Sequence, residues 1–311
     1  MTQSPVAALF PGQGSQSVGM LTDLVKQMPQ LQQIYQQAAS VLGYDLWQLT
    51  QQGPADQLNQ TQITQPAMLT AAMVCWQAWR SHYDVPVSVL AGHSLGEYTA
   101  LVVAGSLTFI DALKLVAERG RLMQETMPDG MGAMAAVIGL TDQQVETVCQ
   151  QAQQNQIVAP ANFNSPGQVV IAGHTQAVQR AIELAQQQGA KLAKLIPVSV
   201  PCHCDLLKPA ADAFQQILAN TAIVAPNIPV LANVDATEHK HPDDIRQSLY
   251  QQLFSPVRWV SIIEQMKQQG ISQWVELGPG RVLTGLNRRI DRTMTIQPIY
   301  DVATLTAYTP Q

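Results

Sequence analysis

A short glycine-bounded segment, Gly-His-Ser-Leu-Gly at residues 92–96, matches the G-x-S-x-G pattern of a nucleophile elbow. The apolar run 87–91 before it predicts a strand, and the apolar residues that continue through Ala104 predict a helix. Such a turn lifts the Ser94 hydroxyl above a sheet edge, where it can attack a carbonyl carbon. The amide of Leu95, at the helix start, would then face the resulting anion. The competing interpretation is an ordinary strand-to-helix turn that contains a serine, and the flanking pattern favours the nucleophile.

A serine nucleophile requires a base within hydrogen-bonding distance, and elimination leaves His203 as the candidate. It lies in a predicted loop between a strand and a helix, where α/β enzymes often place catalytic groups. Cys202, Cys204 and Asp205 beside it do not predict a metal site, because adjacent ligands cannot easily all point at one ion. The other histidines lie at predicted helix ends, in a polar stretch or next to the serine: His82, His174, His239, His241 and His93.

A glycine loop, Gly-Gln-Gly at 12–14, follows the first predicted strand and resembles the start of a dinucleotide-binding fingerprint. Ser17 stands where the third glycine should be, and residues 32–37 contain no acidic side chain that could bind a ribose. The Lys-Ser/Thr ending of a P-loop is also missing. We therefore predict no nucleotide cofactor, and we expect this loop to bring backbone amides close to an active site on another loop.

Arg119 stands out because it lies in an apolar helical pattern, in a chain of which only 13% of residues are charged. On the buried side of that helix it would need an anionic partner, since an unpaired buried charge is unfavourable. A substrate carboxylate bound in a bidentate manner is one such partner. The alternative is a surface arginine paired with Glu118 or Glu125, which sequence spacing alone favours.

The composition excludes several classes of protein. The 311 residues are enough for one large domain or two unequal ones, and 46% are hydrophobic, as in globular proteins. A net charge of -5 and the lack of a Lys/Arg stripe argue against nucleic acid as a partner. The longest apolar run, 131–140, is too short to span a membrane, and no targeting signal precedes the first strand. Without a membrane span or a targeting signal, we expect a cytoplasmic protein. Four cysteines are also too few for a disulfide scaffold.

The order of predicted elements indicates two parts. Met-Pro-Asp-Gly at 127–130 predicts a turn that ends the preceding helix. The next segment follows the order strand, helix, strand, strand, helix, strand, which is ferredoxin-like. We predict a large α/β domain from residues 1–127 and 198–311, interrupted by a small α+β subdomain at 128–197. The large part includes predicted helices at 18–28, 65–82, 109–127, 204–220, 243–253 and 257–268, and strands at 6–10, 87–91, 230–233 and 273–276.

Together these residues resemble one family, the malonyl-CoA:acyl-carrier-protein transacylases of type II fatty acid synthesis. The matching segments follow the family order along nearly the whole chain. They are Phe-Pro-Gly-Gln-Gly-Ser-Gln at 10–16, Gly-His-Ser-Leu-Gly-Glu-Tyr at 92–98, Arg-Gly-Arg-Leu-Met-Gln at 119–124, Asn-Phe-Asn-Ser-Pro-Gly-Gln at 162–168, Val-Ser-Val-Pro-Cys-His at 198–203 and Glu-Leu-Gly-Pro-Gly at 276–280. The resemblance implies an α/β-hydrolase-like core with an inserted ferredoxin-like α+β subdomain.

The resemblance also implies roles for individual residues. Ser94 would carry the acyl group as an ester, and His203 would deprotonate it and later activate the carrier thiol. The backbone carbonyl of Gln252 would orient His203 in place of the usual acidic third member. No cofactor is implied, because exchange between a thioester and a serine ester is nearly thermoneutral.

By the same resemblance, the backbone amides of Gln13 and Leu95 would form the oxyanion hole, and Arg119 would bind the malonyl carboxylate. The chain departs from the family pattern next to the histidine. Cysteines flank His203 where the family often has a serine before it, and Asp205 replaces a common small apolar residue.

The implied partners are malonyl-CoA and acyl carrier protein. A free-standing acyltransferase that serves a modular polyketide synthase would carry the same motifs. A serine thioesterase or acyl hydrolase would share Ser94 and His203 but would not need Arg119, and a non-catalytic scaffold would need none of the three.

Carrier proteins of this pathway are acidic, so this acidic chain should have a local basic patch near the mouth of the site. The alternative is scattered charge that only keeps the protein in solution. The candidate patch residues are Lys191, Lys194, Arg288, Arg289 and Arg292.

Overall fold

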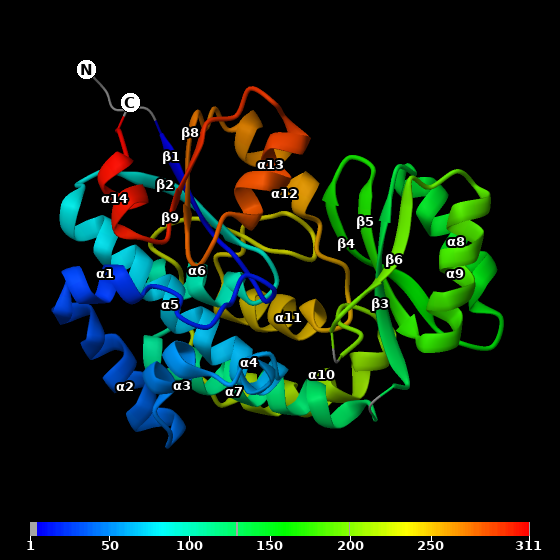
Figure 1. Ribbon diagram of the computed structural model, residues 1–311, viewed down its shortest axis with the longest axis horizontal. Coiled ribbons are helices and arrows are strands. Elements are labelled where there is room, and N and C mark those ends of the chain that lie inside the picture. The colour runs from blue at the N-terminus through cyan, green and yellow to red at the C-terminus, as the bar shows by residue number, and fades with distance from the viewer. Residues whose placement is uncertain (1–4, 129, 199, 311) are drawn as a thin grey trace.

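The computed structural model describes residues 5–128, 130–198 and 200–310, and it has a mixed α/β fold with two separate sheets (Figure 1). One sheet is parallel and the other is antiparallel. Asp129 of the predicted boundary and Ser199 of the histidine segment lie outside the described residues. Within the described ranges, no helix combines the length and the apolar character that crossing a membrane requires.

The parallel sheet is buried on both faces. Successive side chains of its central strand β1 point to opposite faces. Val6, Ala8 and Phe10 therefore belong to one core cluster, and Ala7 and Leu9 belong to the other. Parallel strands covered on both faces read as continuous apolar runs, and this explains the sequence pattern. The strand order is β7-β2-β1-β8-β9, with bounds Val230–Leu231, Val87–Gly92, Val6–Phe10, Gln273–Leu277 and Ile296–Ile299.

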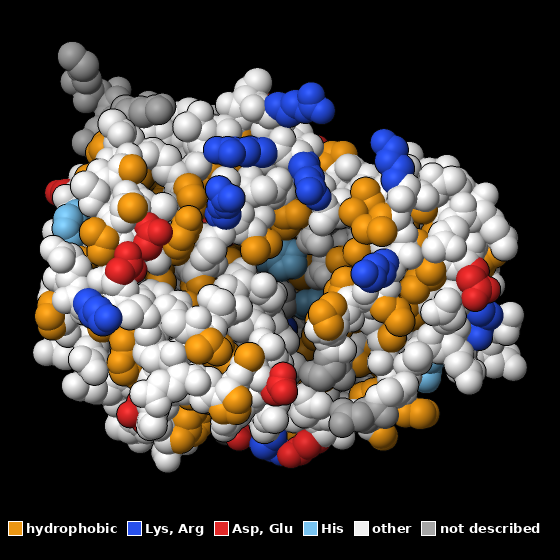
Figure 2. Space-filling model, viewed as in Figure 1, with side chains coloured by type: hydrophobic (Ala, Val, Ile, Leu, Met, Phe, Trp, Pro, Cys, Tyr) orange, Lys and Arg blue, Asp and Glu red, His pale blue; other side chains and the backbone are white. Residues whose placement is uncertain are grey.

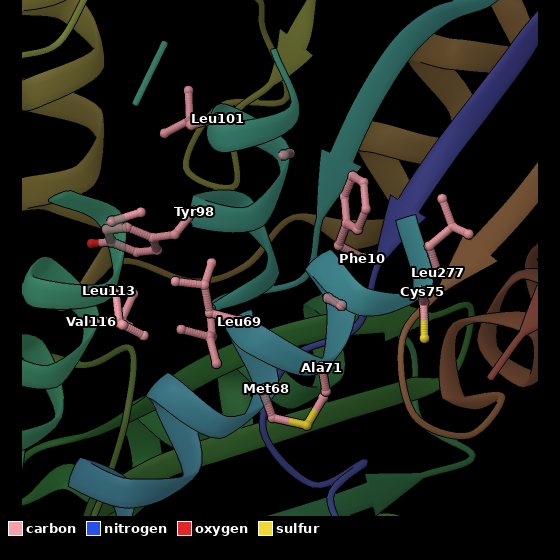
Figure 3. Close-up of a cluster of buried hydrophobic side chains, with 14 of the residues drawn as sticks. Phe10, Met68, Leu69, Ala71, Cys75, Tyr98, Leu101, Leu113, Val116 and Leu277 are labelled. Atoms are coloured by element: carbon pink, nitrogen blue, oxygen red, sulfur yellow. The ribbon is translucent and has the colours of Figure 1, made fainter. Parts of the chain in front are cut away.

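Helices cover the two faces of this sheet unequally. The larger core contains side chains of α5, α6 and α7, and Figure 3 shows Leu69, Tyr98 and Val116 meeting there. The smaller core is closed by α12 and α13. The helices of this part are α1 Thr22–Gln27, α2 Gln32–Leu42, α3 Leu46–Gln52, α4 Ala55–Leu58, α5 Thr61–His82, α6 Gly96–Val103, α7 Phe109–Thr126, α10 Lys208–Ala219, α11 Pro242–Gln252, α12 Trp259–Gln268, α13 Val282–Ile290 and α14 Val302–Ala307.

The antiparallel sheet is built from one continuous segment, at the right of Figure 1. Its helices α8 and α9 cover one face, while Met134 and Ala172 on the opposite face pack with Cys204 and Leu206, next to His203. The predicted order of strand, helix, strand, strand, helix, strand is confirmed. The elements are β3 Gly132–Ile138, α8 Asp142–Gln153, β4 Val158–Ser165, β5 Gln168–His174, α9 Thr175–Gln187 and β6 Leu192–Ile196, in the sheet order β4-β5-β3-β6.

Several predicted bounds in the larger part are wrong. The helix predicted at 18–28 begins only at Thr22, because Leu21 takes a left-handed conformation with φ of 60°. The helix predicted from 65 begins one turn earlier and runs through Pro66. The segment predicted as one helix at 204–220 starts with a separate 3-10 turn, Asp205–Leu207. Strand β9 and helix α14 were not predicted, since β9 is short, contains a proline and lies at the sheet edge.

Candidate active site

The turn after β2 holds Ser94 in the strained conformation of a nucleophile elbow. The φ of Ser94 is 51°, in the left-handed region that a serine rarely adopts. A Cβ at Gly96 would lie 2.1 Å from the Phe10 carbonyl oxygen, so a glycine is needed where the elbow crosses β1. The sequence therefore allows the serine to sit at the carboxyl end of a central strand, on the first turn leading into α6.

Ser94 and His203 form a hydrogen-bonded pair, although 109 residues separate them. Ser94 Oγ lies 2.7 Å from His203 Nε2, and His203 Nδ1 lies 2.8 Å from the Gln252 carbonyl oxygen. A carbonyl can only accept a hydrogen bond, so the proton of neutral His203 must be on Nδ1. Nε2 is then left as the acceptor for the serine hydroxyl, which is the arrangement that general-base catalysis requires.

The surroundings of His203 favour its neutral form. The ring is buried, and this burial, followed by the nearby positive charge of Arg119, lowers its pKa to about 3. A histidine with so low a pKa is unprotonated at neutral pH, so its Nε2 has a lone pair that can accept a hydrogen bond. Asp205 is exposed on the following 3-10 turn and is not among the groups that shift this pKa.

Arg119 lies on the buried face of α7 and is only 1% exposed. Its Nη1 donates to Gln65 Oε1 at 2.8 Å, and its Nη2 donates to Gln252 Oε1 at 3.0 Å. Nη2 also lies 3.4 Å from Ser94 Oγ. The guanidinium is therefore held next to Ser94 by neutral amide oxygens.

No carboxylate among the described residues is hydrogen-bonded to Arg119, and its Nε has no partner there. The predicted alternative, a surface pairing with Glu118 or Glu125, is wrong for this residue. That pairing belongs instead to Arg121, whose guanidinium contacts Glu118 at 2.7 Å and Glu125 at 2.6 Å. A buried positive charge without a hydrogen-bonded counterion can receive an anionic group of a substrate.

The glycine loop after β1 lies directly against the elbow. A Cβ at Gly12 would come within 2.5 Å of the His93 carbonyl oxygen, so the close approach depends on a glycine. Gln13 and Leu95 both line the cavity beside Ser94. Within the described part of the chain, neither of their backbone amides donates to another backbone group.

A cavity of about 420 Å³ opens above Ser94 between the two sheets. The polar groups of the elbow form one wall, and Met134, Asn162 and Ile196 of the antiparallel sheet form the other. Figure 2 shows this hollow with histidine side chains inside it and Lys and Arg side chains along its upper rim. All the predicted site residues meet at this hollow or directly behind it: Gln13, Ser94, Leu95, Arg119 and His203 line it, and Gln252 lies behind Ser94 and Arg119.

Sequence reasoning missed Gln65, Glu97 and Asn233, three buried polar residues behind the site. Asn233 Oδ1 accepts from the Ser94 amide at 2.6 Å, and Glu97 Oε2 accepts from the Gln252 side chain at 2.7 Å. The signal that identified Arg119, a charge within an apolar helical pattern, also applies to Glu97. The asparagine and the glutamine carry no comparable signal.

Comparisons with known proteins identify the family of this chain. A family model described as an acyl transferase domain matches residues 8–306. The malonyl CoA-acyl carrier protein transacylase of Escherichia coli O157:H7 is 50% identical over 307 residues, covering 99% of each chain. The Bacillus subtilis protein of that name is 39% identical over 303 residues, covering 97% of this chain and 95% of its own.

Solved structures of the same kind have the same fold. The malonyl CoA-acyl carrier protein transacylase of Coxiella burnetii matches with a TM-score of 0.96 at 48% identity, covering 98% of this chain and 96% of that one. A malonyl-transacylase in complex with a type II PKS acyl-carrier protein matches with the same TM-score of 0.96, again at 48% identity, covering 97% of this chain and 98% of that one. The chain therefore belongs to the acyl transferase domain family and, within it, to the malonyl-CoA–acyl carrier protein transacylases.

Proposed function

We propose that this chain transfers a malonyl group from malonyl-CoA to the phosphopantetheine thiol of acyl carrier protein, through a malonyl ester on Ser94. The observation that carries the proposal is Arg119, a buried guanidinium 3.4 Å from Ser94 Oγ with no hydrogen-bonded carboxylate among the described residues. A bidentate contact with the free carboxylate of malonate would complete its hydrogen bonds. An acetyl group has no such carboxylate, so the same contact would select the dicarboxylic donor.

In the first half-reaction, His203 Nε2 takes the proton of the Ser94 hydroxyl as Oγ bonds to the thioester carbonyl carbon. The tetrahedral intermediate carries a negative oxygen, and the amides of Gln13 and Leu95 are the donors available to stabilise it. When the carbon–sulfur bond breaks, coenzyme A leaves as a thiolate and takes the proton from His203. The malonyl group remains on Ser94 as an oxygen ester.

The second half-reaction reverses these steps with a different thiol. The phosphopantetheine thiol gives its proton to His203, its sulfur attacks the ester carbonyl, and Ser94 Oγ leaves and takes the proton back. No cofactor is needed, because one acyl bond is exchanged for another in each half. The apolar side chains of Met123 and Ile196 line the cavity, and a site poor in water would protect the ester from hydrolysis.

The finer description of the fold belongs to the same proposal. Residues 1–127 and 198–311 would form an α/β-hydrolase-like catalytic core, and 128–197 would form a ferredoxin-like subdomain of this cytoplasmic enzyme. The strand order β4-β5-β3-β6 of the antiparallel sheet supports the ferredoxin-like assignment. The elbow at the carboxyl end of β2 supports the hydrolase-like one.

We further propose that the carrier protein docks on the five basic residues of the predicted patch, all of which are exposed. Reversing the charge of Arg288 and Arg289 should lower the rate of the carrier half-reaction about 3- to 10-fold at low salt and should leave malonyl-CoA loading unchanged. Unchanged carrier kinetics would remove the patch from the proposal. One solved relative is in complex with a type II PKS acyl-carrier protein. The rate of malonyl transfer should therefore be compared between fatty acid and polyketide carrier proteins.

The function is tested by intact-protein mass after mixing with malonyl-CoA or acetyl-CoA, for the wild type, Ser94→Ala and Arg119→Ala. We expect a malonyl adduct that depends on both residues and disappears when holo carrier protein is added. An adduct lost to water at the same rate without carrier would indicate a hydrolase. The absence of any adduct from either donor would contradict the acyl-serine mechanism.

A further inference from the structure

Glu97 is a buried carboxylate that the proposed mechanism does not use. It lies on the first turn of α6, three residues after Ser94, and is 3% exposed. Burial raises its pKa to about 7. Placing a carboxyl group in the interior is unfavourable unless hydrogen bonds compensate it. The groups that compensate it here belong to the site itself.

The side-chain amide of Gln252 connects Glu97 to Arg119. Gln252 Nε2 donates to Glu97 Oε2 at 2.7 Å and to the Ser94 carbonyl oxygen at 3.1 Å. Gln252 Oε1 accepts from Arg119 Nη2 at 3.0 Å. Carboxylate and carbonyl oxygens only accept, and a guanidinium only donates, so these partners permit a single orientation of the amide. If the amide flipped, its N–H groups would face the guanidinium.

A second connection runs from Glu97 to the nucleophile elbow through Asn233. The Asn233 amide donates to Glu97 Oε2 at 3.0 Å. The Asn233 side chain accepts from the Ser94 amide at 2.6 Å and donates to the Gly92 carbonyl at 2.7 Å. Glu97 Oε2 therefore accepts both from Asn233, which contacts the elbow, and from Gln252, which contacts Arg119.

The same arrangement explains why Arg119 stays available. Glu97 lies close enough to interact with the arginine electrostatically, but the neutral amide of Gln252 stands between the two charges. The carboxylate therefore compensates the positive charge without occupying the N–H groups of the guanidinium. A direct ion pair would instead block them.

We propose that Glu97 is a positioning residue for the substrate carboxylate, acting on Arg119 through the fixed side-chain amide of Gln252. This inference rests on the proposed malonyl transfer. Its consequence is selective, because only a donor with a free carboxylate uses Arg119. A purely structural role of Glu97 at the elbow would affect every acyl donor alike.

The test compares two acyl donors at about pH 8, above the raised pKa of Glu97, on Glu97→Gln, which keeps the size of the side chain and removes its charge. Acylation of Ser94 is followed by rapid-quench mass measurement with malonyl-CoA, and by release of p-nitrophenolate with the uncharged p-nitrophenyl acetate. We expect kcat/KM for malonyl-CoA to fall about 10- to 100-fold, mainly through KM, and the acetate rate to change less than about 3-fold.

The matched control is Glu276→Gln, the same substitution at another buried glutamate. Glu276 accepts from the amides of Leu283 and Thr284 at the start of α13, away from the cavity. This variant should keep the wild-type ratio of malonyl to acetate rates even if its stability decreases. If Glu97→Gln does not fold, Glu97→Asp shortens the side chain, so that its carboxylate no longer reaches Gln252 Nε2, and we expect the same selective loss.

Two outcomes would overturn the role of Glu97: an equal loss with both donors, or no loss with either. The selective loss should also vanish in an Arg119→Ala background, because the two residues act in one chain of contacts. A failure of the proposed function would look different. In that case Arg119→Ala itself would leave the ratio of malonyl to acetate rates unchanged.

Discussion

Helix α7 presents two arginines, two residues apart, to opposite environments. Arg119 faces the interior, where amide oxygens of Gln65 and Gln252 hold it beside the nucleophile. Arg121 faces solvent and pairs with Glu118 and Glu125 on its own helix. Within the described part of the chain, the same residue type is therefore left without a hydrogen-bonded carboxylate on one face, as the proposed anion receptor, and forms a surface ion pair on the other.

The difference shows that the location of the counterion decides what an arginine can do. Arg121 finds its carboxylates within one helical turn, so its N–H groups are already used. Arg119 is surrounded by neutral acceptors, and its guanidinium carbon lies 5.6 Å from the centre of the Tyr98 ring. An arginine held this way keeps part of its binding capacity for a ligand, and the following experiments test that contrast.

The strongest test removes each arginine in turn. Arg119→Ala should lower kcat/KM for malonyl-CoA about 100- to 1,000-fold, because it deletes a charged, bidentate contact, whereas Arg121→Ala should change it less than about 2-fold. Steady-state malonyl transfer to carrier protein measures both values. Similar losses in the two variants would show that burial on α7 does not separate the two roles.

A smaller effect is expected when the charge is kept and the shape is changed. Arg119→Lys retains a positive group but loses the planar fork, so malonyl transfer should fall about 10- to 100-fold. The acetyl adduct formed by acetyl-CoA should stay near the wild-type amount. Wild-type malonyl kinetics in this variant would mean that charge alone is sufficient.

A test of the stability of the protein in acid compares Arg119 with another buried basic residue, His203. A buried histidine becomes neutral, whereas a buried arginine keeps its charge. In the unfolded chain, a histidine takes a proton below about pH 6.5, but folded His203 does so only near its lowered pKa of about 3. Its contribution to stability is therefore present above about pH 6.5 and is lost as the pH falls toward 3, with a slope of at most about 1.4 kcal/mol per pH unit. Urea midpoints between pH 4 and 7 should fall less steeply for His203→Gln, and parallel curves would contradict this.

The smallest effect concerns the surface pairs of Arg121. The side chains of Arg121, Glu118 and Glu125 are all exposed to solvent. Arg121→Ala should therefore change the free energy of unfolding by only about 0.5 kcal/mol, and less at high salt. Thermal unfolding at low and high ionic strength measures the difference. A large, salt-independent destabilisation would show that this face of α7 also depends on a specific contact.

Much of the fold could be predicted because its patterns are local. The α+β segment was recognisable from alternating short strands and helices with clear turns, such as Gly167 between β4 and β5. The strand predicted at 230–233 has only Val230 and Leu231 in the sheet. Just beyond the ladder, the Asn233 side chain accepts from the Ser94 amide, and this contact spans 139 residues along the chain.

The site could be predicted only as far as its chemistry is visible in residue types. Ser94 is marked by its glycines, and His203 remained after elimination. Spacing alone favoured a surface position for Arg119, because its buried position depends on how α7 packs against α5. The link from Glu97 to Arg119 joins three distant segments, and no periodicity in the sequence indicates it.

The two walls of the cavity come from different stretches of the chain. Ser94, Arg119 and His203 all lie outside 128–197, whereas Met134, Asn162 and Ile196 lie within it. The inserted segment thus supplies a wall of the cavity, and the side chains of the proposed chemistry come from the two segments that flank it. Under the proposed function, substitutions at Met134 or Ile196 would reshape the cavity, whereas selection of the substrate carboxylate would stay with Arg119 in the flanking segments.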